Sequence, residues 1–116
     1  MWREFRFHAT LPAYLFTMDE EKKKVLKDVR LLVQGVIDCL FEDEDGSLVL
    51  IDYKTDRIPG EIYHDRERVK AFFNERHHQQ LFYYTLAIEQ MFGKRPDRVE
   101  IYSTALADTI PMDVSN

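Results

Sequence analysis

Residues 48–54 have the sequence Leu-Val-Leu-Ile-Asp-Tyr-Lys, an apolar run that ends in a carboxylate and an ammonium group. Four consecutive aliphatic residues predict a buried strand. Because side chains at positions i and i+2 of a strand project from the same face, Asp52 and Lys54 should emerge together. A similar apolar run at residues 31–37 is followed by Asp38 and predicts a second strand over residues 31–41.

The polar segment between these strands predicts a tight hairpin that contains Gly46. A three-residue hairpin loop commonly ends with a glycine in the left-handed region. This rule makes the loop residues 44–46 and pairs Asp43 with Ser47. Asp38 then faces Asp52, with Cβ atoms roughly 4.5–5.5 Å apart. A slip of one residue would move Asp38 to the other face of the sheet.

Two opposed carboxylates need a physical reason. At about 4 Å, like charges repel by ~4 kcal/mol at an effective dielectric constant of 20, and a bound divalent cation would reverse that sign. Oxygen ligands without Cys or His at ligand spacing suit Mg²⁺ or Mn²⁺, and Lys54 beside them could hold a water or a phosphoryl oxygen. The alternative is that Asp38 and Asp52 are solvated strand-end carboxylates and Lys54 is only their counter-charge. Spacing alone leaves both interpretations open.

The rest of the chain predicts an α/β fold, a mixed β-sheet with flanking helices. Leu81, Tyr84 and Ile88 recur at helical spacing and predict the main helix. The expected elements are a strand over 4–11 that ends at Pro12, a charged loop or short helix over 19–27, a helical turn or two over 65–73, the main helix over 75–92 with Asn74 as N-cap and Gly93 as its stop, and strands over 98–104 and 110–114.

Gln80 and Tyr84 are four residues apart, so they share one face of the main helix. Leu81 and Ile88 should lie toward the sheet, which lets Gln80 and Tyr84 reach the edge where the 48–54 strand ends. The alternative is that Tyr84 is a core residue with its hydroxyl at the rim and that Gln80 is a boundary residue.

Composition sets further limits. The 116 residues, 45% of them hydrophobic, suffice for one folded domain, and no apolar stretch approaches the ~20 residues of a membrane span. Cys39 is the only cysteine, which fits a reducing cytosol, and it should be a buried small residue. The net charge of −5 argues against tight DNA binding by this domain alone. His77 and His78 are adjacent and therefore a poor metal pair; we interpret them as surface or phosphate-neighbouring residues.

Three blocks of sequence occur in a fixed order: Gly-Val-Ile-Asp at residues 35–38, Asp-Tyr-Lys-Thr-Asp at 52–56 and Gln-Leu-Phe-Tyr-Tyr at 80–84. Together they resemble the RecB-type nuclease domain of the PD-(D/E)XK superfamily, and most of all the C-terminal nuclease domain of AddA-type (RexA-type) helicase-nuclease subunits. The resemblance covers roughly residues 30–104. It implies a restriction-endonuclease-like core and metal-dependent hydrolysis of DNA phosphodiester bonds.

The resemblance also implies a role for each site residue. Asp38 and Asp52 would ligate Mg²⁺ or Mn²⁺, and the backbone carbonyl of Tyr53 would complete the shell. Lys54 would orient the attacking water or help to deprotonate it. Gln80 and Tyr84 match the family's Gln-x-x-x-Tyr motif, which supports the site and contacts DNA.

Two features of the family are missing from the sequence. The family has an upstream helix with a histidine that faces the metal, and this helix would precede the strand over 4–11. The Gly-x-x-x-x-Gly-Lys-Ser/Thr loop of a helicase is also absent. We therefore expect residues 1–116 to be a single nuclease-like domain, a fragment of a larger helicase-nuclease that lacks its N-terminal helix.

This interpretation implies an exonuclease in the bacterial cytoplasm that acts in double-strand break processing and recombinational repair. Its expected partners are DNA, the helicase portion of the same polypeptide and a second nuclease subunit, with no membrane. Two alternatives stay open. The domain could be a non-catalytic DNA-binding or assembly module of the same fold, or a small stand-alone exonuclease of the phage type.

Overall fold

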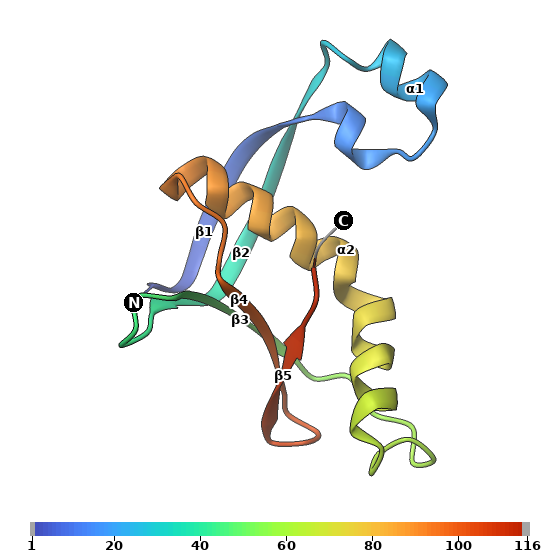
Figure 1. The fold of residues 1–116 in the computed structure, drawn as a ribbon, viewed down its shortest axis with the longest axis vertical. Helices are drawn as coiled ribbons and strands as arrows, with labels where there is room; N and C mark the ends of the chain where they lie inside the picture. Colours follow the sequence, from blue (N-terminus) through green and yellow to red (C-terminus); the bar gives the residue numbers. More distant parts are fainter. Residues whose placement is uncertain (1, 115–116) are drawn as a thin grey trace.

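The computed structural model describes residues 2–114, which form an open five-stranded sheet with one long helix packed against it (Figure 1). In spatial order the strands are β1 (Trp2–Pro12), β2 (Arg30–Glu42), β3 (Leu48–Lys54), β4 (Arg98–Ser103) and β5 (Asp108–Met112). Only β3 and β4 are parallel among the described neighbours, so the sheet is mixed, as predicted. Helix α2 (Arg66–Phe92) is the crossover that this parallel pair requires.

The β2–β3 hairpin has the predicted register. Its ladder runs from the pair Glu42–Leu48 to the pair Cys39–Ile51. The turn is closed by the N–H of Asp43, which donates to the carbonyl of Ser47 at 2.8 Å, and Gly46 has the expected left-handed φ of 85°. Asp38 and Asp52 follow the last pair of this ladder on their two strands.

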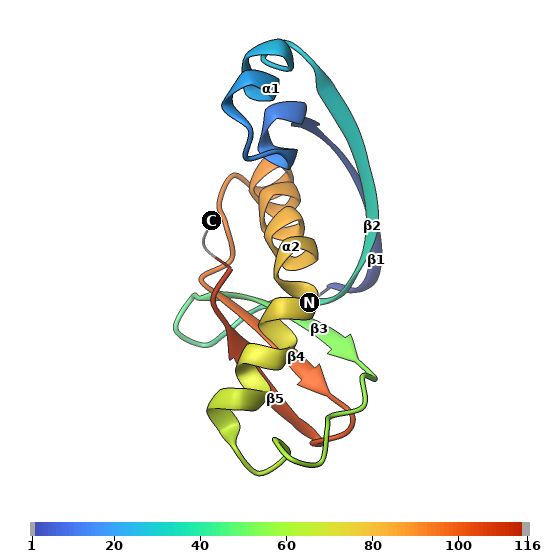
Figure 2. The ribbon, with the colours of Figure 1, turned by 90° about the vertical axis from the view of Figure 1, so that its right-hand side faces the viewer.

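Strand β1 and most of β2 form a long curved ribbon that extends beyond the other strands (Figure 2). We call residues 2–37 the arm. Its tip carries the 3₁₀ helix η1 (Ala13–Phe16) and the short helix α1 (Glu20–Val25). The carboxylate of Asp19 caps α1 by accepting from two backbone N–H groups. The charged stretch over 19–27 is therefore a short helix, one of the two predicted alternatives.

Strand β2 changes direction at Asp38. Ile37 and Leu40 are both fully buried in one core cluster, although residues three apart on a regular strand face opposite sides. Across the ladder, Glu4 has a left-handed φ of 46°, and the described β1–β2 pairs pass over Glu4 and Asp38. A break of this kind bends and twists a strand. Asp38 therefore lies where the arm joins the rest of the sheet.

Helix α2 starts earlier than predicted. It begins at Arg66, where the carboxylate of Asp65 caps it by accepting from the N–H of Arg68 at 3.2 Å. The prediction that Asn74 is the N-cap is therefore wrong. Val69 and Phe73 are four residues apart and both buried, so the apolar face of the helix continues through this region. The helix ends at Gly93, with a φ of 82°, as predicted.

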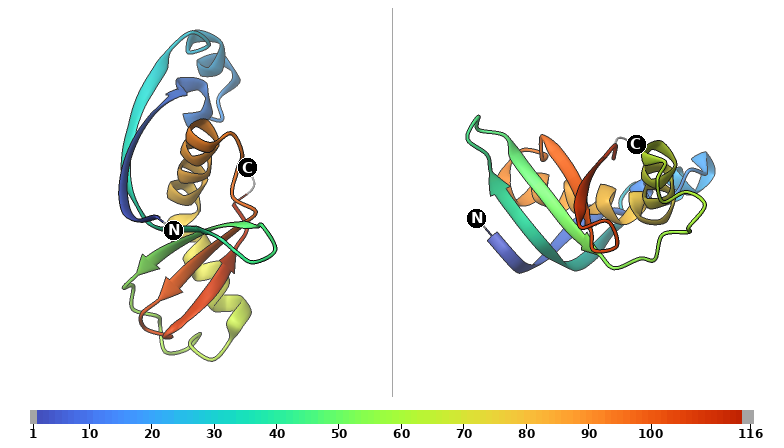
Figure 3. Two further views of the ribbon diagram at one scale, coloured as in Figure 1. Left: turned by 90° about the vertical axis from the view of Figure 1, so that its left-hand side faces the viewer. Right: turned by 90° about the horizontal axis from the view of Figure 1, so that it is seen from below.

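The hydrophobic core lies between α2 and the sheet, on the side enclosed by the curved arm (Figure 3). Leu81 and Ile88 of the helix are fully buried in it, as predicted, together with Leu50 of β3 and Ile101 of β4. Cys39 is also buried, as expected for a small apolar residue. Within residues 2–114, no helix has the length and apolarity needed to cross a membrane.

Candidate active site

The β2–β3 hairpin brings the carboxylates of Asp38 and Asp52 together. Oδ2 of Asp38 accepts the backbone N–H of Tyr53 at 2.9 Å, so this side chain reaches across to β3. The side chain of Asp52 is only 5% exposed. Burial raises the pKa of Asp52 to about 6; the ammonium of Lys54 opposes this increase, and a hydrogen bond and negative charge from Asp38 add to it. The two acidic groups therefore converge.

Lys54 joins this pair from the end of β3. Its Nζ lies 2.7 Å from Oδ2 of Asp52 and donates a hydrogen bond to Oε1 of Gln80 at 2.8 Å. Among the described residues, Oδ2 of Asp52 is buried and has no partner with the alignment of a hydrogen bond. The contact with Lys54 is therefore an ion pair, and the oxygen keeps its capacity to accept.

Gln80 and Tyr84 connect Lys54 to α2. Nε2 of Gln80 donates to the hydroxyl of Tyr84 at 3.2 Å, which completes a chain of contacts from Lys54 through Gln80 to Tyr84. Burial, followed by the charge of Asp52, raises the pKa of Tyr84, so its phenol is protonated at neutral pH. The structure thus places both helix residues of the predicted site beside the lysine.

Gly35 allows Tyr84 to pack closely on β2. A Cβ atom at Gly35 would lie 2.9 Å from Cε1 of Phe7 and 3.1 Å from Cε1 of Tyr84. The two rings meet edge to face, with centroids 5.4 Å apart. The glycine of the Gly-Val-Ile-Asp block is therefore required by a close approach of two rings three residues before Asp38.

Comparison with known families agrees with this geometry. A model of the PD-(D/E)XK nuclease superfamily matches residues 2–110, a span that includes every residue of the site described above. The chain belongs to the PD-(D/E)XK nuclease superfamily. The resemblance predicted from the three sequence blocks is confirmed.

Curated relatives of this PD-(D/E)XK chain are named as the first of the subunits of an ATP-dependent helicase/nuclease. The protein from Listeria monocytogenes (serotype 4b, strain F2365) is 40% identical over 90 residues, or 78% of this chain. Those from Clostridium botulinum (strain Hall) and Acetivibrio thermocellus are 38% identical over 111 residues (96%) and 39% identical over 101 residues (86%). The matched segments make up only 7–8% of the relatives' lengths. The predicted likeness to helicase-nuclease subunits of the AddA type is confirmed.

PD-(D/E)XK nucleases generally use divalent metal ions, and the residues of this chain fit such an ion. Asp38 and Asp52 offer hard oxygen ligands, and the buried Oδ2 of Asp52, which has no hydrogen bond, is an acceptor that a cation would satisfy. Across residues 2–114, no group of three His, Cys, Asp or Glu side chains is placed to hold a metal. Two carboxylates still suffice for Mg²⁺, which keeps several waters and takes further ligands from substrate phosphate.

Sequence reasoning missed one set of contacts beside this PD-(D/E)XK site. The carboxylate of Asp56 accepts Nε of Arg76 at 2.8 Å, and Nε2 of His77 lies 3.1 Å from both of its oxygens. Although burial raises the pKa of Asp56, its hydrogen bonds with His77 and Arg76 lower the pKa overall. These contacts fasten the segment after Lys54 to α2. The side chain of His77 is only 17% exposed, so its interpretation as a surface residue was incomplete.

Proposed function

We propose that this chain is a metal-dependent deoxyribonuclease domain that hydrolyses DNA phosphodiester bonds as an exonuclease. The observation that carries this proposal is the buried carboxylate of Asp52, placed beside Asp38 and 2.7 Å from the ammonium of Lys54. Membership of the PD-(D/E)XK nuclease superfamily supports it.

The names of the relatives support a setting for this activity. They describe one subunit of an ATP-dependent helicase/nuclease. We propose that this domain works beside a helicase portion and a second nuclease subunit in the bacterial cytoplasm, where the assembly processes double-strand breaks for recombinational repair. Strand choice and processivity would then come from the motor, which agrees with the net charge of −5 on this chain.

The proposed ligands of the ion are the carboxylates of Asp38 and Asp52 and the backbone carbonyl of Tyr53. When bound there, Mg²⁺ or Mn²⁺ would supply Lewis acidity toward the scissile phosphate and a lowered pKa for a water molecule. Mg²⁺ prefers oxygen ligands of this kind, usually one or two carboxylates.

Lys54 is placed to act on the reacting groups. An ammonium has three donors; one bonds Gln80 and another side of the group faces Asp52. A third donor is available for the attacking water or a phosphoryl oxygen. The positive charge of Lys54 would also offset the negative charge that develops in the transition state.

Gln80 and Tyr84 would hold Lys54 and contact the DNA backbone. The carbonyl of Gln80 fixes the ammonium, and its amide N–H bonds the phenol of Tyr84. Because the pKa of Tyr84 is raised, the phenol can donate to a phosphate oxygen at any physiological pH. Phosphate contacts position a nucleic acid without selecting its sequence.

Digestion of end-labelled linear DNA with Mg²⁺ or Mn²⁺ tests the proposal. Asp52→Ala and Lys54→Ala should each lower the cleavage rate by at least about a hundredfold, as expected when a preorganised charge is removed from a reacting centre. Glu44→Ala is the matched control, because it removes an exposed carboxylate from the turn of the same hairpin. Unchanged cleavage by Asp52→Ala or Lys54→Ala would end the proposal.

A non-catalytic DNA-binding or assembly module is the second candidate. It is favoured by the two-carboxylate ligand set, since no third His, Cys, Asp or Glu joins it among residues 2–114, and by the negative net charge. Such a module would bind DNA or a protein partner without any Mn²⁺ site that depends on Asp38 and Asp52. DNA that stays intact with either metal, together with the absence of that site, would favour this candidate.

A further inference from the structure

The Gln-x-x-x-Tyr pair of the candidate active site occurs a second time, one residue earlier. Nε2 of Gln79 donates to the hydroxyl of Tyr83 at 2.8 Å, just as Gln80 donates to Tyr84 at 3.2 Å. Consecutive residues of a helix are rotated by roughly 100°, so the two pairs leave α2 in different directions. The Gln80 pair contacts Lys54, and the Gln79 pair faces the tip of the arm.

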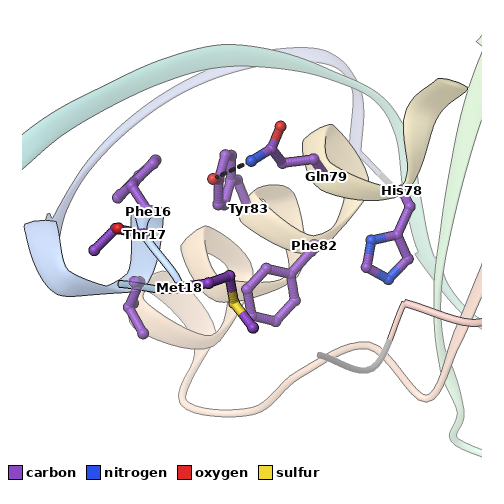
Figure 4. Close-up of a pocket in the computed structure, with 8 residues that line it drawn as sticks. Phe16, Thr17, Met18, His78, Gln79, Phe82 and Tyr83 are labelled. Carbon is purple, nitrogen blue, oxygen red and sulfur yellow. Dashed lines mark hydrogen bonds between the residues drawn. The ribbon is translucent and has the colours of Figure 1, made fainter. Parts of the chain in front are cut away.

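The Gln79–Tyr83 pair borders a cavity of about 170 Å³ between α2 and η1 (Figure 4). Flat rings form much of its wall. The ring of Phe16, from η1, lies 4.4 Å from the ring of Tyr83 between centroids, and His78 is stacked on Phe82 with only 8° between the ring planes. The cavity is smaller than the roughly 300–1,000 Å³ of pockets that enclose drug-sized ligands, so it suits a single ring system.

This cavity is continuous with the candidate active site. A shallow pocket between β2 and α2 is bordered by both pairs, Gln79 with Tyr83 and Gln80 with Tyr84. Its first pair also lines the cavity under η1, and its second pair leads to Lys54. A ligand held at Lys54 could therefore extend along α2 into the cavity.

We propose that this cavity binds one base of single-stranded DNA, beside the nucleotide whose phosphate is hydrolysed. The inference rests on the proposed nuclease function. Aromatic side chains stack on any base, because every base has a π-face. The bond to Tyr83 uses one N–H of Gln79, so its second N–H and its carbonyl remain for a base edge. A base in a duplex would first have to be unstacked, at a cost of a few kcal/mol, which selects single strands.

The test is binding of a fluorescein-labelled oligothymidylate of about 12 nucleotides, a length within the range of single-strand sites. EDTA prevents hydrolysis, and low salt preserves phosphate contacts. Tyr83→Leu keeps an apolar side chain but removes the flat ring, so its Kd should rise by about 5- to 100-fold. Tyr14→Leu is the matched control, because Tyr14 is a 40% exposed tyrosine of η1 that does not line the cavity, and it should bind like the parent.

Gln79→Ala keeps the test decisive if Tyr83→Leu does not fold. Gln79 is exposed on α2, and Ala is the best helix former, so this variant should fold. The lost hydrogen bond should raise Kd by about 2- to 10-fold. Parent-like binding by both variants, an equal loss for duplex DNA of the same sequence, or no binding by the parent would overturn the inference.

The two proposals fail separately. If DNA is not cleaved but oligothymidylate binding depends on Tyr83, the base site stands and the nuclease proposal falls. If cleavage needs Asp52 but oligothymidylate binding ignores Tyr83 and Gln79, the nuclease proposal stands and the base site falls.

Discussion

Lys54 and Gln80 lie 26 residues apart in the chain and are joined by a 2.8 Å hydrogen bond from Nζ to Oε1. This bond ties the end of β3 to the middle of α2. Because Nζ also lies 2.7 Å from Asp52, the ammonium is held by two elements at once. A free lysine side chain loses up to ~2 kcal/mol of rotamer entropy when it is fixed, so holding it in advance avoids that cost when substrate binds.

Gly35→Ala should disturb the site by crowding Tyr84. The added Cβ would lie 2.9 Å from the ring of Phe7 and 3.1 Å from that of Tyr84, and neither ring is the free end of a flexible chain. We expect the free energy of unfolding to fall by about 1–3 kcal/mol, measured by urea unfolding, with a lower cleavage rate. Gly60→Ala is the control, because no heavy atom lies within 4 Å of its Cβ position; equal stability of the two variants would contradict the packing described here.

Asp52 should make the metal-free chain less stable as pH rises. Its pKa is about 6 in the folded chain against 3.8 for an unperturbed Asp, so between these values the folded state holds more protons than the unfolded state. The free energy of unfolding therefore falls as pH increases. This contribution is fully present below pH 3.8 and is lost as pH rises through about 6, by on the order of 2–3 kcal/mol.

Asp52→Asn isolates that effect. In EDTA, urea unfolding of the parent and the variant between about pH 4 and pH 7 should show the parent losing stability relative to the variant. Subtracting the two curves removes the contributions of the other carboxylates, several of which have lowered pKa values and slopes of the opposite sign. Parallel curves would show that Asp52 titrates as an ordinary carboxyl group.

The start of α2 can be tested by two alanine substitutions. Asp65→Ala removes the N-cap and should lower the free energy of unfolding by about 0.5–2 kcal/mol. Asn74→Ala should leave stability unchanged or raise it, because Oδ1 of Asn74 is buried without a hydrogen bond among the described residues and Ala favours helix. A larger loss for Asn74→Ala, by thermal or urea unfolding, would mean that the helix begins near residue 74.

The hairpin at the centre of the site was predictable because its register depends on local chemistry. A glycine in a left-handed turn fixes the loop, and the loop fixes which residues lie opposite one another. Gln80 and Tyr84 were likewise placed on one helix face by their spacing. Their contact with Lys54 depends on how α2 packs on the sheet, and the sequence left that open.

Other parts were missed for identifiable reasons. Polar residues around Asn74 resembled a helix start, but Val69 and Phe73 already had the i, i+4 spacing of a continuous buried face. The pair Gln79–Tyr83 has the same spacing and could have been found. The contacts of Asp56 with His77 and of Phe16 with Tyr83 join distant segments, and no pattern of local spacing predicts them.

Binding of Mn²⁺ to this chain tests the central claim most directly, namely that Asp38 and Asp52 hold one divalent cation between them. Titration calorimetry near pH 7.5 should show one site in the parent and in the Glu44→Gln control, with affinity lowered about tenfold or more in both Asp38→Asn and Asp52→Asn. No Mn²⁺ site in the parent, or parent-like affinity in both variants, would contradict the account.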